Sequence, residues 1–449
     1  MNKKENKISK EIKINKKSAR RNHSNQTGIT LIALVVTIVV LLILAGVSIN
    51  ALFGDSGIIN KAKDAQNKMD EATQNDLDSI NELNNWIDGK INGTTGGGTT
   101  GGDANPSTTP KISTLVGKVV DKNTKAEDAY GNKITIPKGF KILEHNPTSS
   151  TGAVTYNYTN SEETGEHIPA VQDGIVIEDT QEGTAGNQFV WVPVGTIKNK
   201  DNKTNTITLG RYEFDSDTGA LISTTPAQVA SVENCTQTVT IGGNFQELST
   251  SRISSSSSEN TTARNLAEFI STTLANGGYY IARYEASGTT ERITSKYDQT
   301  VLTSITQPNA AKAAREMYGE VKENNELVYA SDLVNSYAWD TAIIFIQTYG
   351  IGTDASTYAS KNKSTSFAKT GINNDKYCNI WDMSGNASEW TTEYSIYFKG
   401  ESIFTPCVPR GGCYNTVYGR AFDYTSYRDN YSTTVSVSGN GLRPLLYVK

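Results

Sequence analysis

With 449 residues and a formal net charge of −5, the chain is long enough for two or three domains and has no basic excess to support a nucleic-acid-binding role. Its four cysteines include no CxxC pair, which argues against a zinc knuckle and against a dense disulfide scaffold. Only three histidines are present, and His23 lies in a basic N-terminal stretch, so the rest of the chain cannot supply a three-histidine metal site.

The N-terminus reads as a cytoplasmic leader followed by a membrane anchor. Residues 1–28 carry nine Lys or Arg against two Glu, and residues 31–47 carry no charge. With its flanks, the apolar run 29–53 is long enough to cross a bilayer core of ~30 Å as a helix. Because basic residues stay on the cytoplasmic side, we expect a single-pass cell-membrane protein whose bulk is extracellular.

The junction between this leader and "ITLIALVVTIVVLLILAG" resembles the cleavage and methylation motif of type IV prepilins. The resemblance implies that a prepilin peptidase cuts between Gly28 and Ile29 and that pilin-like subunits are partners. An ordinary secretory signal would place its cleavage site after the apolar run. The sequence departs from pilins at Ala33, where they carry Glu, and at Ile29, where they carry Phe or Met. Cleavage therefore fits better than assembly into a long fibre, and a plain signal anchor is the alternative.

A stalk and a linker follow the anchor. Gly and Asp in residues 54–57 are expected to end the membrane helix, and residues 54–88 form an amphipathic pattern with a polar centre. This helix is either a solvated stalk or a packing face for other subunits. Residues 89–110 are rich in Gly and Thr, which is typical of a flexible linker and suits the display of a head domain.

The head, residues 111–449, is predicted to be an α+β domain with long loops. Residues 133–143, 173–179, 189–194, 206–214 and 277–286 have the alternation of strands, and residues 262–275, 309–318 and 332–349 have helical patterns. The stretch 214–221, "FDSDTGAL", contains Asp-x-Asp-x-Gly but lacks the downstream acidic residue of a calcium loop. It is therefore predicted to be a β-turn.

Six blocks of the head occur in one order: "GNQFVWVPVG", "GGYYIARYEAS", "NSYAWDTAIIFIQ", "NIWDMSGNASEWT", "VPRGGCY" and "GNGLRPLL". Together they resemble the formylglycine-generating enzyme (sulfatase-modifying factor) family. The resemblance implies a variant of the C-type lectin fold with little regular structure. It also implies that Trp381 and Trp390 pack in the core, that Gly385 and Asn386 form a tight turn, and that Arg443 anchors the last strand through backbone hydrogen bonds.

The ligands of both chemistries known in that family are missing here. The copper-binding cysteine pair of one branch would fall near Thr416 and Ala421, and the iron branch needs three His where the head has His145 and His167. We therefore expect no cofactor or metal and no inherited catalysis. A small structural Cys413, or a disulfide from it to Cys407 or Cys378, is the main interpretation of that thiol. Glu389 and Glu393 resemble a carboxylate pair but have no evident cleft.

The segment between "RGG" and "GLR" is the candidate ligand-binding surface. Its Tyr-rich, Asn- and Asp-containing composition is typical of binding surfaces such as antibody paratopes, and it is similar to the variable proteins of diversity-generating retroelements. Half of its tyrosines could equally be core. The candidates are Tyr414, Asn415, Tyr418, Arg420, Asp423, Tyr424, Tyr427, Arg428, Asp429, Asn430 and Tyr431.

These observations favour a membrane-anchored or pilin-like binding protein on the bacterial cell surface, whose head takes an extracellular protein or glycan ligand. Two alternatives stay open. One is a divergent enzyme of the same family that uses Cys413. The other is a minor pilin or pseudopilin in a surface fibre after cleavage.

Overall fold

The computed structural model describes Val36 and residues 109–449, except 151, 161–164, 236–238, 248–251, 254–258, 359–365, 401 and 415–423. The chain divides into two units, Met1–Ala104 and Asn105–Lys449. Apart from Val36, the leader, the expected membrane helix, the stalk and the linker up to residue 108 lie outside the described residues, and so do Gly28 and Ile29. Within the part of the chain that is described, no helix is both long enough and apolar enough to span a bilayer.

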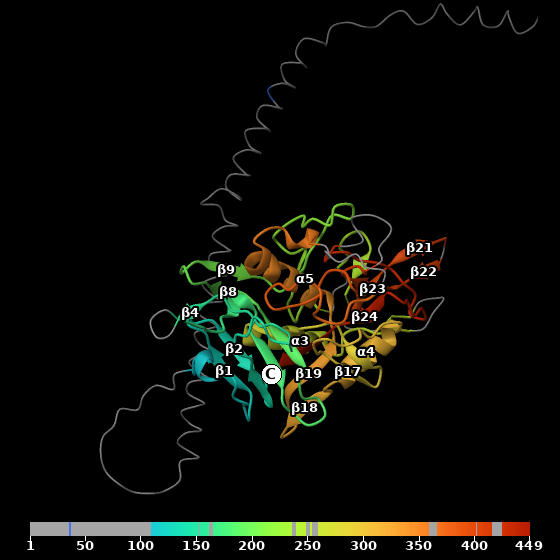
Figure 1. Ribbon diagram of the computed structural model, residues 1–449. Coiled ribbons are helices and arrows are strands. Elements are labelled where there is room, and N and C mark those ends of the chain that lie inside the picture. The colour runs from blue at the N-terminus through green and yellow to red at the C-terminus, as the bar shows by residue number, and fades with distance from the viewer. Residues whose placement is uncertain are drawn as a thin grey trace, which may run out of the picture. The chain divides into compact units, whose positions relative to one another are not determined.

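A seven-stranded antiparallel sheet organises the second unit (Figure 1). Three of its interior strands, β7, β15 and β25, are buried along their whole length. The last strand of the chain pairs between two earlier strands, so the C-terminus closes the middle of the sheet. In spatial order the strands are β18 (Glu320–Glu323), β19 (Glu326–Leu333), β25 (Pro444–Val448), β15 (Gly278–Ala282), β7 (Gln188–Pro193), β6 (Val176–Asp179) and β3 (Phe140–Ile142).

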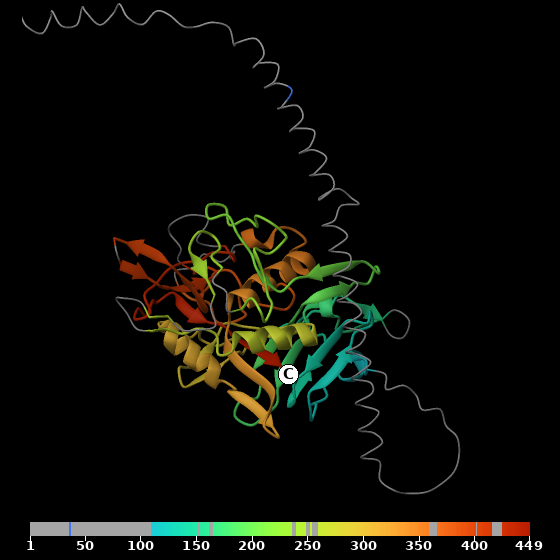
Figure 2. The ribbon, with the colours of Figure 1, turned by 180° about the vertical axis from the view of Figure 1, so that it is seen from behind.

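Three α-helices flank this sheet. Helices α3 (Leu266–Asn276) and α4 (Gln307–Glu316) pack on β15, β19 and β25 (Figure 2). Helix α5 (Ser336–Phe345) is buried at all ten positions and continues as a π-helical turn, Ile346–Ile351. The Asn335 side chain caps α5 by accepting the Ala338 N–H at 2.9 Å. All three predicted helices are confirmed, although residues 332 and 333 belong to β19 and not to α5.

A second, four-stranded sheet contains the candidate site. Strand β20 (Ser388–Ser395) lies between β12 (Phe245–Gln246) and β23 (Cys407–Arg410), and β24 (Asn440–Leu442) pairs with β20 in parallel. The sequence patterns did not predict β20, because its residues SEWTTEYS are mostly polar. All eight are nevertheless buried. Several of their polar groups find partners inside the molecule, such as Thr391 with the Val408 carbonyl and Thr392 with Glu247, whereas the Ser395 hydroxyl has no hydrogen-bond partner.

The other strands are two to four residues long and pair as hairpins around these sheets. They are β1 (Thr124–Glu127) with β2 (Lys133–Ile136), β4 (Thr159–Asn160) with β5 (Glu166–His167), β8 (Gly195–Lys198) with β9 (Thr204–Ile207), β10 (Gly210–Arg211) with β11 (Gln228–Val229), β13 (Arg252–Ile253) with β14 (Glu259–Asn260), β16 (Ser287–Thr289) with β17 (Arg292–Thr294), and β21 (Tyr397–Lys399) with β22 (Ser402–Phe404). The predicted strands are confirmed, mostly as shorter segments. The fold is thus sheet-rich and mixed, with few helices.

The stretch "FDSDTGAL" forms a turn, as predicted. Phe214 and Leu221 make an antiparallel bridge across it. The Asp215 carboxylate accepts hydrogen bonds from the Asp217 N–H at 3.1 Å and from the Thr218 N–H at 2.7 Å, which is the usual role of Asp at a turn. Among the described residues, no group of three His, Cys, Asp or Glu is placed to hold a metal ion.

Candidate functional site

The site begins at the glycine pair of "RGG", just after β23. Gly411 has φ +86°, a conformation that L side chains rarely adopt. A Cβ there would also lie 3.0 Å from the Met383 carbonyl oxygen and 3.2 Å from the Trp339 ring. Glycine is therefore required twice over at this position. The tight passage directs the preceding residue, Arg410, into the interior, where its side chain is fully buried.

Five buried residues, Arg211, Arg410, Arg428, Asp340 and Glu393, form what we term the charge network. Glu393 lies 3.0 Å from Arg211, 3.3 Å from Arg410 and 3.0 Å from Arg428. Asp340 lies 2.7 Å from Arg410 and 2.8 Å from Arg428. Burial alone would raise the pKa of Glu393, but the three guanidinium groups overcome this and lower it to about 2. The three guanidinium groups outnumber the two carboxylates by one, and each carboxylate is paired with at least two of them inside the protein.

The charge network holds down the segment 424–431, which we term the recognition segment. Arg410 donates to the Tyr427 carbonyl at 3.1 Å and to the Ser426 carbonyl at 3.4 Å. Cys407 and Arg410 in β23 make antiparallel bridges to Tyr431 and Arg428. The buried Ser426 hydroxyl donates to backbone carbonyls at two further points. The backbone of the recognition segment is therefore fastened to the scaffold by buried polar contacts.

Part of the same segment faces outward. Tyr427, Asp429 and Tyr431 are partly exposed, and Asn430 is exposed. The Asp429 carboxylate accepts the Asn430 N–H at 2.7 Å. Burial, followed by the nearby Asp429 charge, raises the pKa of Tyr431 to about 12 and raises that of Tyr427 further. Both phenols therefore stay protonated at neutral pH.

The remaining predicted surface residues have different placements. Tyr414 is partly exposed and packs edge-on against Phe367, with ring centroids 4.4 Å apart. Tyr424 lies over Gly219, where any Cβ would meet its ring at 2.1 Å. Arg428 points inward and is only 7% exposed. Four further candidates, Asn415, Tyr418, Arg420 and Asp423, lie outside the described residues.

None of the four cysteines forms a disulfide. The pairing of Cys413 with Cys407 or Cys378 considered from the sequence is therefore not made. Cys413 is partly exposed, with its sulfur 3.3 Å from the position that a Cβ on Gly439 would take. Burial raises the pKa of the Cys407 and Cys378 thiols, which keeps both of them as unreactive thiols at neutral pH.

Arg443, directly before β25, makes the backbone hydrogen bonds that the family resemblance implied. Its guanidinium donates to the carbonyls of Ala282, Trp381 and Asp382 and pairs with Glu389 at 2.6 Å. Gly385 and Asn386, with φ +77° and +57°, form the predicted turn. Glu389 and Glu393 are not a catalytic pair facing a cleft, because both are fully buried and paired with arginines.

The two tryptophans of the block "NIWDMSGNASEWT" differ from one another in burial. Trp390 is fully buried, and its indole N–H donates to the Ile305 carbonyl at 2.8 Å. Trp381 is only partly buried: its ring stacks on Tyr284 at 6.4 Å and lies under the Lys376 ammonium at 5.6 Å. The expectation that both pack in the core is therefore confirmed for Trp390 and wrong for Trp381.

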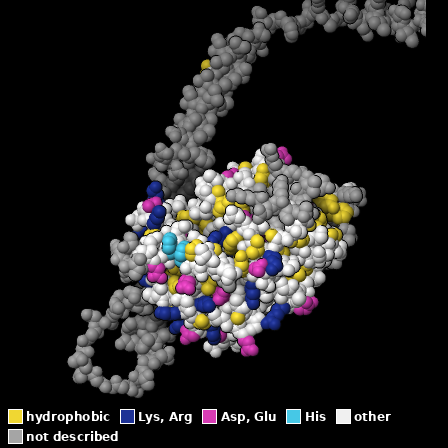
Figure 3. Space-filling view, viewed as in Figure 1, with side chains coloured by type: hydrophobic (Ala, Val, Ile, Leu, Met, Phe, Trp, Pro, Cys, Tyr) yellow, Lys and Arg dark blue, Asp and Glu magenta, His cyan; other side chains and the backbone are white. Residues whose placement is uncertain are grey.

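A histidine pair was not predicted, because its members are 22 residues apart in sequence. The rings of His145 and His167 stack with centroids 4.0 Å apart and planes inclined by 14° (cyan in Figure 3). The Tyr156 N–H donates to His145 Nδ1 at 3.0 Å, and His167 Nδ1 lies 2.7 Å from the Tyr156 carbonyl oxygen. Because Nδ1 of His145 is an acceptor, its proton sits on Nε2, and this nitrogen has no lone pair for a metal.

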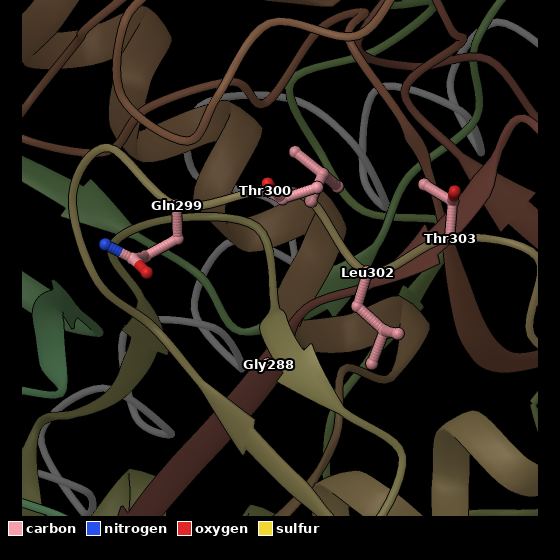
Figure 4. Close-up of a pocket in the computed structure, with 6 residues that line it drawn as sticks. Gly288, Gln299, Thr300, Leu302 and Thr303 are labelled. Carbon is pink, nitrogen blue, oxygen red and sulfur yellow. The ribbon is translucent and has the colours of Figure 1, made fainter.

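A shallow cavity of about 460 Å³ lies beside the β16–β17 hairpin (Figure 4). It is lined by Gly288 and residues 299–303, whose side chains are Gln, Thr, Val and Leu. No acid, base or thiol lines it, so it offers none of the groups that general acid–base or nucleophilic catalysis requires. We find no support there for an active site.

No protein-family model matches the sequence, and no curated protein matches it. Weak likenesses occur among solved structures. CarF is 15% identical over 38% of this chain and 87% of its own, with a TM-score of 0.28. Variable protein 1 of Treponema denticola is 13% identical over 60% and 98%, with a TM-score of 0.23. The I1 variant of the Major Tropism Determinant is 13% identical over 76% and 99%, with a TM-score of 0.26. TM-scores of this size do not define a shared fold.

Proposed function

We propose that the head is a ligand-binding domain and that the recognition segment is the centre of its binding surface. The observation that carries the proposal is that some side chains of residues 424–431 are buried while others are partly exposed. Buried contacts of Ser426 and Arg428 immobilise the backbone, while Tyr427, Asp429 and Tyr431 stay partly exposed. A rigid backbone that presents tyrosines loses little entropy on binding, which favours recognition.

We further propose that the head has a variant of the C-type lectin fold. Support comes from where the six sequence blocks lie. They supply strands β7, β15, β20 and β23, helix α5, and the β24–β25 end of the chain. These elements form the two sheets and the buried helix that carry the recognition segment. A resemblance that falls on the structural centre of a domain is more informative than one confined to its loops.

The membrane anchor completes the proposal. We infer that residues 29–53 hold the protein in the cell membrane with the head outside, because the basic leader and the uncharged run have the order that the positive-inside rule requires. The extracellular ligand is then a protein or glycan of the surroundings or of another cell. The Gly/Thr-rich linker at residues 89–110 lets the head extend away from the membrane surface.

The proposal is tested with the purified full-length chain on arrays of glycans and extracellular proteins. We expect the wild type to bind some of these ligands. A Tyr427→Ala/Tyr431→Ala variant should bind the same ligands with an affinity at least about tenfold lower, which corresponds to about 1.4 kcal/mol. Thermal unfolding of the same samples separates lost binding from lost folding.

Tyr397→Ala is the matched control, because Tyr397 is a tyrosine of the β21–β22 hairpin, outside the recognition segment, that is 42% exposed. Binding should survive this change. Array ligands that bind the double variant as tightly as the wild type would show that the recognition segment is not the binding surface.

A further inference from the structure

We infer that a turn at residues 215–220, which we term the support turn, fixes the recognition segment in place, and that its Gly219 sets the orientation of Tyr424. This role rests on the proposed function, because it concerns what holds the binding surface in shape. The two stretches are far apart in sequence: Ser426 and Gly219, which meet where they touch, are separated by 207 positions.

The support turn is closed by its own hydrogen bonds. The Asp215 carboxylate accepts the Asp217 N–H at 3.1 Å, and it accepts both the N–H and the hydroxyl of Thr218 at 2.7 Å. The Gly219 N–H donates to the Asp215 carbonyl at 2.8 Å, and the Asp215 N–H donates to the Ala220 carbonyl at 2.8 Å. Because these contacts are local, the turn keeps its shape by itself and can act as a fixed support.

Gly219 makes two contacts with the recognition segment. Its carbonyl oxygen accepts the Ser426 hydroxyl at 2.7 Å. The Tyr424 ring lies directly against its Cα, since a Cβ at this position would lie 2.1 Å from Cδ2, 2.7 Å from Cγ and 2.9 Å from Cε2 of that ring. Non-bonded carbon atoms do not approach so closely. The missing side chain of Gly219 therefore makes the room in which the Tyr424 ring lies.

The backbone of the recognition segment cannot retreat from this contact. Thr425, the next residue after Tyr424, is buried; its N–H donates to the Tyr358 carbonyl at 2.9 Å, and its carbonyl accepts the Trp339 indole N–H at 2.9 Å. Rotating the Tyr424 ring about its own axis does not remove the clash, because Cγ lies on that axis. A side chain at position 219 is therefore accommodated only if the partly exposed ring swings outward.

Backbone strain alone is a competing reason for glycine at position 219. Gly319 separates the two reasons, because its φ of +67° is close to the +72° of Gly219, yet a Cβ at Gly319 would meet nothing within 4 Å. Gly319→Ala adds strain without a clash, whereas Gly219→Ala adds the same kind of strain and a clash with Tyr424. Only Gly219→Ala should displace the ring.

Nitration of the full-length chain by tetranitromethane, which modifies accessible tyrosine rings, measures the position of Tyr424. Trypsin releases residues 421–428 as one peptide, so mass spectrometry compares Tyr424 and Tyr427 in the same sample. We expect Gly219→Ala to raise the nitration of Tyr424 relative to Tyr427 at least about fivefold. Gly319→Ala should leave this ratio within about twofold of wild type. A general loosening of the head would raise the nitration of both tyrosines together.

An unchanged ratio in a folded Gly219→Ala protein, or an equal rise in the two glycine variants, would overturn the inference. If Gly219→Ala does not fold, a second pair of variants decides. Asp215→Ala removes the carboxylate that closes the support turn, whereas the matched Asp217→Ala removes an equally exposed carboxylate from a residue whose N–H serves the turn. Asp215→Ala should raise the nitration ratio at least about threefold over Asp217→Ala, and equal ratios would contradict the inferred role.

Binding gives a further measure, with the array protein or glycan that the wild type binds most tightly as the probe. We expect Gly219→Ala to weaken its binding about fivefold and to have no further effect once Tyr424 is replaced by Ala, because both changes act through one ring. Losses of affinity that add in the double variant would mean that the support turn affects binding by another route, and would overturn the role of Gly219.

The two proposals fail separately. If array ligands require Tyr427 and Tyr431 while the nitration ratio is the same in all variants, the binding function stands and the support turn does not position Tyr424. If the nitration ratio changes as expected while array ligands bind the Tyr427→Ala/Tyr431→Ala variant normally, the support turn positions Tyr424 and the proposed function is wrong.

Discussion

Arg428 illustrates how a residue's neighbours in space, and not its neighbours in sequence, determine its role. It lies among Tyr, Asp and Asn in a stretch that reads as a polar surface. In the structure it is 7% exposed and joins two carboxylates contributed by α5 and β20. Its guanidinium forks between Asp340 and Glu393, a geometry that Arg supplies and Lys does not. The residue therefore attaches the recognition segment to the interior through its ion pairs with Asp340 and Glu393.

Replacing Arg428 by Ala should destabilise the head by about 3 kcal/mol, because the buried Asp340 and Glu393 carboxylates each lose a charged hydrogen-bond donor. Denaturant unfolding of the full-length chain measures the change. Asn430→Ala, at the exposed neighbour two positions on, should change stability by less than about 0.5 kcal/mol. An Arg428→Ala protein as stable as the Asn430→Ala protein would mean that the charge network does not hold the segment.

At the scale of elements, the loop leading into β4 is clamped between distant parts of the chain. Tyr156 is fully buried, and its backbone N–H and C=O are bracketed by His145 and His167. Lys376 donates to the Ala153 carbonyl at 3.0 Å on the same loop. Burial, followed by the proximity of His167 and Lys376, lowers the pKa of His145. The clamp thus depends on a neutral His145 ring.

This arrangement predicts a pH effect of defined sign. A lowered histidine pKa means that the unfolded chain binds the proton more readily, so the contribution of His145 to stability is present above pH 6.5 and is lost as pH falls below it. His145→Asn keeps an acceptor for the Tyr156 N–H but does not titrate. Relative to wild type, its melting temperature should therefore rise as the pH is lowered from 7 to 5.

His23→Asn, in the leader, is the control for loss of an imidazole and should parallel the wild type across this range. Buried carboxyl groups with raised pKa values, such as Asp375, make the protein more stable as the pH falls, which opposes the effect of His145. The prediction therefore concerns the difference in melting temperature between the variant and the wild type at each pH. Parallel melting curves for His145→Asn and wild type at both pH values would contradict the prediction.

At the scale of the whole molecule, the sequence joins a basic leader, an apolar run, a stalk, a linker and a head. The described residues from 109 onward form a unit with its own core and two sheets. The proposed binding by the head and the proposed anchoring by the N-terminus can therefore be tested separately. Processing at the N-terminus decides whether the mature chain keeps its leader.

We predict that the mature protein begins at N-methylated Ile29, because Gly28 ends a basic leader directly before the apolar run. Mass spectrometry of the N-terminal peptide from the native membrane fraction measures this. An intact leader would identify a plain signal anchor and would exclude the prepilin-like route. Detection of the methylated peptide in sheared surface fibres would favour a minor pilin.

The sequence alone determined the elements whose signals are local. Segments rich in Val, Ile and Tyr marked β7 and β15, a helical pattern over residues 332–349 marked α5, and counting histidines excluded a three-histidine site. These features depend on residues a few positions apart. The family blocks also predicted the Arg443 anchor and the turn at Gly385 and Asn386.

Only the tertiary structure decided which polar residues are buried. Arg211 meets Glu393 across 182 positions, and Arg428 meets Asp340 across 88. No local pattern reports such pairs, so β20 was missed and Arg428 was placed on the surface. A charge is stable in the interior only where the fold brings its counter-charge to it. With the Arg428 guanidinium paired in the interior, Asp429 is the charged side chain that the recognition segment leaves partly exposed.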